Sequence, residues 1–178
     1  MSKSADAFKG SIKDAEDLLA HFDAMTKPPP DNAEVLKRAG LVMALTAWET
    51  YVEDRVREEV GARLRAINGS HIGKFVTGRL EEELKRFHNP TAEKTRKLFL
   101  DYLEVDVTTG WEWQQVDAPK AKKTLDDLIS KRGDAVHRSK PQTNGLPPPP
   151  HLVKREDLER SIKFLKSLVD ATDRVLIV

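Results

Sequence analysis

Hydrophobic residues recur at spacings of three and four along nearly the whole chain, which is the pattern of amphipathic α-helices. The first such run predicts a helix and contains Phe8, Ile12, Ala15, Leu19 and Phe22. The prolines at 28–30 must end this helix, because proline disfavours helical backbone in the residue before it. Residues 1–30 are therefore predicted to form an N-terminal helix and a proline-rich turn.

The longest periodic segment follows this turn and extends to Ile67, with Asp31 or Asn32 predicted as its cap. One apolar stripe along it is formed by Leu41, Leu45, Trp48, Val52, Val56, Val60, Leu64 and Ile67. In its first half the apolar surface is widened by Val35, Leu36, Ala39, Val42, Met43 and Ala47. We therefore expect that half to be central in the fold. Glu49 also falls on the stripe, so its carboxylate is predicted to face inward.

Shorter helices are predicted in the middle of the chain. The sequence Asn-Gly-Ser at 68–70 breaks the long helix, and the spacing of Leu80, Leu84 and Phe87 indicates a short helix after it. Asn89-Pro90 then fits an N-cap followed by proline at the first helical position. This pair is predicted to start a helix that runs through Leu103.

A further helix is predicted from about Ala118 to His137, with Asp117 as its cap. Its apolar stripe is formed by Leu125, Leu128, Ile129, Arg132, Ala135 and Val136. Residues 108–110 separate it from the preceding helix and leave Trp111 and Trp113 in a connecting loop. Their alternate spacing is compatible with one short extended segment.

The proline-rich residues 139–153 are predicted to form an exposed loop, which is either a plain connector or a lid over a site. A final amphipathic helix follows, with Leu158, Ile162, Leu165, Leu168, Val169, Thr172, Val175 and Leu176 on one face. The sequence has no internal repeat, no long heptad seam and no segment with strand period. We therefore predict an all-α fold, an up-and-down bundle of four to six helices. Residues 1–178 should form a single domain, because this length suffices for one core.

Composition and charge narrow the range of partners. The net charge is only +1, so no overall field draws the protein onto nucleic acid or an anionic membrane. Basic residues do gather between positions 120 and 140, either as an ordinary solvated helix face or as a phosphate-binding surface. Cysteine is absent, which excludes disulfides and cysteine nucleophiles and fits a cytoplasmic protein. No apolar run approaches membrane-spanning length, so we expect a soluble protein.

Arg132 lies on the apolar stripe of its helix, where a permanently charged guanidinium needs a partner or a water-lined groove. Glu49 is likewise a charged residue on the apolar stripe of its helix. The two are predicted to form a structural ion pair between facing helices, with a catalytic role for Glu49 as the alternative. His137 follows Arg132 by five residues, about 140° around an ideal helix. Gly133 between them is a poor helix former and lets the backbone deviate.

The spacing of Arg132 and His137 gains meaning from its context. This hexad ends an amphipathic helix, and the sequence Trp-Glu-Thr-Tyr-Val at 48–52 lies on a long earlier helix. Gly-Trp-Glu-Trp at 110–113 precedes the motif helix, and a final amphipathic helix follows the proline-rich loop. Together these features resemble the HEPN superfamily, in particular its RiboL-PSP branch, over roughly residues 32–177. Gly133 departs from the pattern, because HEPN ribonucleases usually have Asn, His or Asp there.

Other catalytic chemistries fit the sequence poorly. The five histidines are scattered, with no pair at helical spacing and no carboxylate cluster at ligand spacing, so neither a metal site nor a cofactor is predicted. His21, His88 and His151 are assigned to the surface or to helix ends. What remains is an Arg and a His beside an acid, and such a group can cleave RNA without a metal.

The resemblance implies a metal-independent endoribonuclease in which the 2′-hydroxyl of the RNA attacks the phosphate. Arg132 would stabilise the phosphate and His137 would transfer protons. Asp134 would orient the His137 ring, unless it pairs with Arg138 or is simply a solvated acid.

One imidazole cannot comfortably serve as base and acid at once. HEPN proteins usually form dimers that bring two motifs into one cleft, so a homodimer in which two copies of His137 divide these roles is expected. The resemblance also admits a toxin or phage-defence role with a partner antitoxin. Some HEPN toxins carry a modified Tyr two residues after the His, where this chain has Ser139. The alternative to catalysis is an RNA-binding or dimerisation module.

Overall fold

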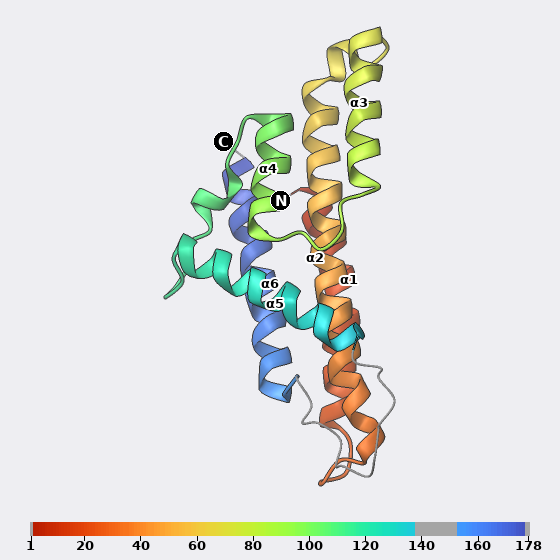
Figure 1. The fold of residues 1–178 in the computed structure, drawn as a ribbon, viewed down its shortest axis with the longest axis vertical. Coiled ribbons are helices and arrows are strands. Elements are labelled where there is room, and N and C mark those ends of the chain that lie inside the picture. The colour runs from red at the N-terminus through yellow and green to blue at the C-terminus, as the bar shows by residue number, and fades with distance from the viewer. Residues whose placement is uncertain (1, 138–152, 177–178) are drawn as a thin grey trace.

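A computed structural model describes residues 2–137 and 153–176, and these residues contain six α-helices (Figure 1). The helices are α1 (Lys3–Asp23), α2 (Glu34–Arg63), α3 (His71–Leu84), α4 (Ala92–Leu103), α5 (Ala118–His137) and α6 (Arg155–Leu176). Short 3-10 turns lie at Asp31–Ala33, Arg65–Ile67 and Val107–Gly110. The predicted all-α bundle is confirmed, and α5 has the predicted bounds. Most of the predicted proline-rich loop, including Ser139 and His151, lies outside the described residues.

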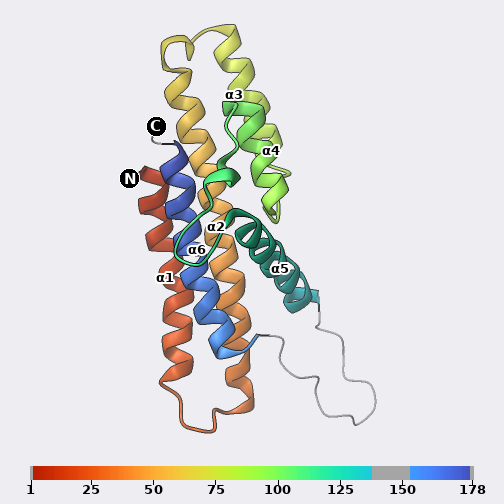
Figure 2. The same cartoon turned by 90° about the vertical axis from the view of Figure 1, so that its left-hand side faces the viewer.

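Consecutive helices run in alternating directions along the bundle (Figures 1 and 2). Helices α1, α2 and α6 lie side by side, and α1 makes its most extensive contact with α2. The C-terminal half of α2 extends beyond α1 and α6, and α3 folds back along it. Helix α5 crosses the bundle obliquely and packs on α2 and α4. Within the described residues, no helix is both long and apolar enough to span a bilayer.

Helix α2 is the centre of the core. The middle of its predicted stripe is fully buried, at Leu41, Leu45, Trp48, Val52 and Val56. Gly40 allows α6 to approach closely, because a Cβ there would lie 2.7 Å from Leu158 Cδ2. The first half of α2 is central in the bundle, as predicted, although Val35 and Met43 are 51% and 36% exposed. The apolar surface of this half is wider than the neighbouring described helices cover.

The loop between α4 and α5 contributes a large side chain to the core. Trp111 is fully buried, its indole N–H donates to Thr172 Oγ1 in α6 at 2.9 Å, and its ring packs edge-on against Trp48. Trp113 is partly buried against Phe164, and it forms an isolated antiparallel bridge with Val116. The short extended segment considered for this loop is therefore reduced to a single bridge.

The helix caps agree only in part with the predictions. Asp117 caps α5 as expected, since its Oδ1 accepts the backbone N–H of Lys120 at 2.9 Å. The cap predicted at Asp31 or Asn32 is wrong, because a 3-10 turn leads into α2 and Ala33 occupies the cap position. The cap predicted at Asn89 is also wrong. Thr91 caps α4 instead, and Asn89 has a left-handed backbone with φ of 53°.

A buried ion pair joins α2 to α6 and to the start of the chain. Arg55 Nε donates to Asp173 Oδ1 at 2.8 Å, and the Ser2 hydroxyl donates to the same oxygen at 2.6 Å. Burial alone would raise the pKa of Asp173. The hydrogen bonds from Ser2 and the Arg55 charge outweigh burial, so this pKa lies below its ordinary value. Sequence periodicity does not predict this network.

Candidate functional site

Arg132 on α5 and Glu49 on α2 form the predicted ion pair. Arg132 Nη1 lies 3.0 Å from Glu49 Oε2, and the two side chains are 19% and 17% exposed. The stripes of the two helices place these charges opposite each other where α5 crosses α2. The pair lies at the rim of the core and not in its interior, because both side chains keep some contact with solvent. A partly exposed guanidinium remains accessible to a ligand.

Asn89 completes the contacts of this pair, and no sequence pattern had assigned it to the site. Its side-chain oxygen accepts a hydrogen bond from Arg132 Nη1 at 3.0 Å. Its backbone N–H donates to Glu49 Oε2 at 3.1 Å. Asparagine tolerates the left-handed backbone more readily than most residues, which explains its use at this turn. The signal in the sequence was the Asn-Pro dipeptide, which fits a turn as well as a helix cap.

The linker between α3 and α4, residues 85–91, is fixed at several further points. The Trp48 indole N–H donates to the Pro90 carbonyl at 3.2 Å from within the core. Asp126 Oδ1 on α5 accepts the backbone N–H of Ala92 at 2.8 Å, directly after the linker. Lys94 Nζ donates to the His88 carbonyl at 2.7 Å. The linker backbone is therefore attached to α2 and α4, and α5 holds the first residue of α4.

This attachment brings His88 to the ion pair. His88 Nδ1 lies 3.7 Å from Glu49 Oε1, while the His88 side chain is 70% exposed. The assignment of His88 to the surface is confirmed. Its position beside Glu49 and Arg132 could not be read from the sequence, because the contact spans 39 residues of chain. We refer to Thr46, Glu49, His88, Asn89 and Arg132 as the Glu49 cluster.

The two amino groups of Arg132 differ in their contacts. Nη1 is shared by Glu49 and Asn89, whereas Nη2 has among the described residues a single contact of 3.5 Å, to Thr46 Oγ1. Nη2 therefore has hydrogen-bonding capacity left for a ligand.

One turn further along α2, burial raises the pKa of Glu53. The Arg57 charge lowers this pKa, and the Glu49 charge raises it further.

The remaining predicted site residues lie at the end of α5. The helix continues through Gly133 to His137, so Gly133 causes no break there. A Cβ added at Gly133 would meet no described atom within 4 Å, so a larger residue fits sterically. The side chains of Asp134 and His137 lie outside the described residues. Their roles therefore remain predictions.

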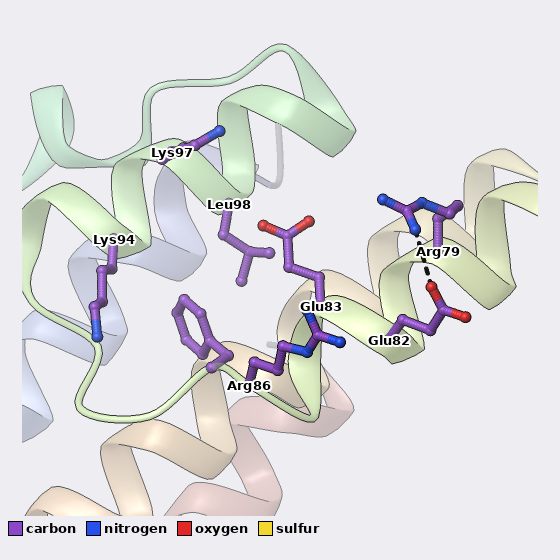
Figure 3. A pocket seen from close by; sticks show the side chains of 8 residues that line it. Arg79, Glu82, Glu83, Arg86, Lys94, Lys97 and Leu98 are labelled. Atoms are coloured by element: carbon purple, nitrogen blue, oxygen red, sulfur yellow. Dashed lines mark hydrogen bonds and ion pairs between the residues drawn. The ribbon is translucent and has the colours of Figure 1, made fainter.

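A cleft of about 390 Å³ opens between α3 and α4, next to the linker (Figure 3). Four cations, two carboxylates and two apolar side chains line it: Arg79, Arg86, Lys94, Lys97, Glu82, Glu83, Phe87 and Leu98. Arg79 pairs with Glu82 at 2.9 Å, and the Tyr102 hydroxyl donates to Glu83 at 3.0 Å. Burial and this hydrogen bond raise the pKa of Tyr102 to about 12. The excess of positive charge suits a phosphate backbone.

Among the described residues, no three His, Asp or Glu side chains are grouped as a metal site.

Comparison with known proteins identifies the family to which the chain belongs. No curated protein and no solved structure shows significant similarity to the chain. The model of the RiboL-PSP-HEPN family, in contrast, matches residues 10–178. Because this match covers nearly the entire bundle, including both helices that carry Glu49 and Arg132, the chain belongs to the RiboL-PSP-HEPN family.

Proposed function

We propose that this protein is a metal-independent endoribonuclease in which Arg132 stabilises the reacting phosphate and His137 transfers a proton. The observation that carries the proposal is the way in which Arg132 is held. Two acceptors fix Nη1 at 3.0 Å each, and the side chain remains partly exposed at the bundle surface. A guanidinium that is already oriented stabilises developing negative charge without reorganising during the reaction. Membership of the HEPN family supports the same reaction class.

The proposed reaction uses the substrate's own nucleophile. A base takes the proton of the ribose 2′-hydroxyl, and the 2′-oxygen forms a bond to phosphorus. The phosphorane carries additional negative charge, which Arg132 Nη2 can neutralise. The bond from phosphorus to the 5′-oxygen then breaks as an acid protonates that oxygen. The products are a 2′,3′-cyclic phosphate and a 5′-hydroxyl end.

Cleavage of a synthetic RNA by the pure protein tests this reaction. We expect cutting to continue in EDTA and the new end to carry a 2′,3′-cyclic phosphate, measured by mass spectrometry. A single 2′-deoxy nucleotide at the mapped cut should abolish cutting there, because it removes the nucleophile. The matched control carries the 2′-deoxy nucleotide one position away and should be cut normally. Cutting at the deoxy position, or loss of cutting in EDTA, would reject the mechanism.

We further propose that the protein acts as a homodimer, with RNA bound where two motifs meet. Its biological setting would be that of a toxin or phage-defence ribonuclease, restrained by a partner antitoxin. The exposed apolar residues of α2 support self-association. Val35 and Met43 lie on the same side of α2 as Thr46, which contacts Arg132. A two-fold interface on this side would bring the Glu49 clusters of two subunits together.

Met43→Glu is expected to shift the dimer toward monomer, because the new charge would be buried in the interface. Multi-angle light scattering at micromolar concentration measures this. Ile72→Glu is the matched control, since Ile72 is an exposed apolar residue on α3 and should leave the dimer intact. A wild-type monomer with full ribonuclease activity would refute the dimer.

A non-catalytic RNA-binding module is the second candidate. The cationic lining of the cleft between α3 and α4 favours it. The two candidates differ in one measurement. Retention of RNA in a gel-shift assay without any cleavage would replace the enzyme by the binding module.

A further inference from the structure

We infer that His88 is the second proton-transfer group of the site and serves as the base that takes the proton of the 2′-hydroxyl. His137 then acts as the acid that protonates the leaving 5′-oxygen. This inference rests on the proposed ribonuclease activity and adds a residue to it. The family resemblance, in contrast, predicts that a second subunit supplies the second imidazole.

The Glu49 carboxylate places His88 and Arg132 in one site. Its Oε2 atom accepts from Arg132 Nη1 and from the Asn89 backbone, at 3.0 and 3.1 Å. Its Oε1 atom lies 3.7 Å from His88 Nδ1. This distance is longer than a hydrogen bond, so Glu49 faces the His88 ring without fixing its tautomer. Glu49 is thus the neighbour that His88 and Arg132 share.

The backbone holds His88 in this place although its side chain is exposed. Lys94 Nζ holds the carbonyl of His88 itself, and Glu49 holds the amide of the next residue. The Trp48 indole holds the Pro90 carbonyl from the core. A side chain on a fixed backbone loses less freedom when substrate binds, which is a requirement for efficient proton transfer.

His88 is also accessible to a long substrate. Its side chain is 70% exposed, and its neighbour Phe87 lines the cationic cleft between α3 and α4. Lys94 lines the same cleft while it bonds the His88 carbonyl. An RNA strand in the cleft would therefore contact the residue that precedes His88 in the chain. His71, in contrast, is an exposed histidine at the start of α3 with no ion pair to any described residue.

The proton balance of the step is complete with these two histidines. The proton of the 2′-hydroxyl moves to the unprotonated nitrogen of the neutral His88 ring as the bond from O2′ to phosphorus forms. The bond from phosphorus to O5′ breaks, and His137 gives its proton to O5′. Each histidine ends in the protonation state in which the other began, and exchange with water restores both. No metal or oxidant enters this step.

The test compares His88→Ala with His71→Ala and wild type on the same RNA under single-turnover conditions. General bases contribute about 10² to 10⁴ in rate, so His88→Ala should lose at least a hundredfold in the cleavage rate. RNA affinity and thermal stability should stay near wild type, because the side chain is mostly exposed. His71→Ala should cleave normally. Free imidazole should restore part of the rate of His88→Ala, since the vacated position is open to solvent.

The outcomes separate this inference from the proposed function. If His88→Ala cleaves within about threefold of wild type while His137→Ala is inactive, His88 is not the base and the ribonuclease proposal stands. A weaker affinity with an unchanged cleavage rate would make His88 an RNA-binding residue and would also overturn the inference. If wild type fails to cleave RNA, the proposed function fails first.

Discussion

Replacement of His137 by alanine is expected to slow RNA cleavage at least a hundredfold while leaving the protein folded. A positioned general acid or base accounts for about 10² to 10⁴ in rate, and the expected loss is the lower end of that range. His137 is the last residue of α5, so its truncation removes no interior turn of the helix. Single-turnover cleavage with excess enzyme measures the chemical step without product release. Circular dichroism and thermal melting verify that the fold is retained.

His71→Ala serves as the control for this experiment, because it also removes an exposed imidazole at a helix end. Arg132→Ala is a poorer test of catalysis. It would remove the hydrogen bonds to Glu49 and Asn89 together, and the linker could shift as a result. Equal cleavage by His137→Ala and wild type would exclude His137 from the reaction and favour the RNA-binding module.

Arg55→Ala is expected to lower the free energy of unfolding by about 3–5 kcal/mol, the usual cost of breaking a buried ion pair from one side. The Arg55 and Asp173 side chains are 2% and 6% exposed, so Asp173 would be left charged in the interior. For a chain of this size, the loss corresponds to a fall in melting temperature of about 6–20 °C. Thermal and urea unfolding measure it.

Arg57→Ala is the matched control for this loss. Arg57 lies on the same helix as Arg55 and pairs with Glu81 on α3 at 2.9 Å, but its side chain is 36% exposed. Exposed pairs contribute at most about 1 kcal/mol, so this variant should unfold close to wild type. Because the pKa of Asp173 is lowered in the folded state, its contribution is complete above about pH 4 and is lost as the pH falls further. Equal destabilisation by the two variants would contradict the buried pair.

The helices and the central ion pair could be predicted because both follow from local pattern. Spacings of three and four define where each helix lies, and Asp117 marks the start of α5 correctly. A charge on an apolar stripe also indicates that a partner exists. Glu49 and Arg132 are charged residues on two apolar stripes. Their pairing could therefore be predicted from the sequence, and the structure confirms it.

The rest of the site depends on how distant segments meet, and periodicity carries no such information. The sequence predicts a helix cap at Asn89, because Asn-Pro satisfies the rules for a cap and for a turn equally well. In the structure, the contacts of Asn89 with Glu49 and Arg132 stabilise the turn instead of a cap. His88 lies in the same linker and therefore also reaches the site. Arg55 lies on the flank of its stripe, and its partner is 118 residues away in α6.

The sharing of one carboxylate among several donors constrains how this family member can evolve. Glu49 accepts from a side chain on α5 and from the backbone of the linker, and its second oxygen faces an imidazole. A substitution at position 49 affects Arg132, the Asn89 backbone and His88 at once. A substitution at one of these neighbours affects only its own contact with Glu49. We therefore expect substitutions at positions 49 and 132 to be coupled, and position 89 to be linked to them through its side-chain bond to Arg132.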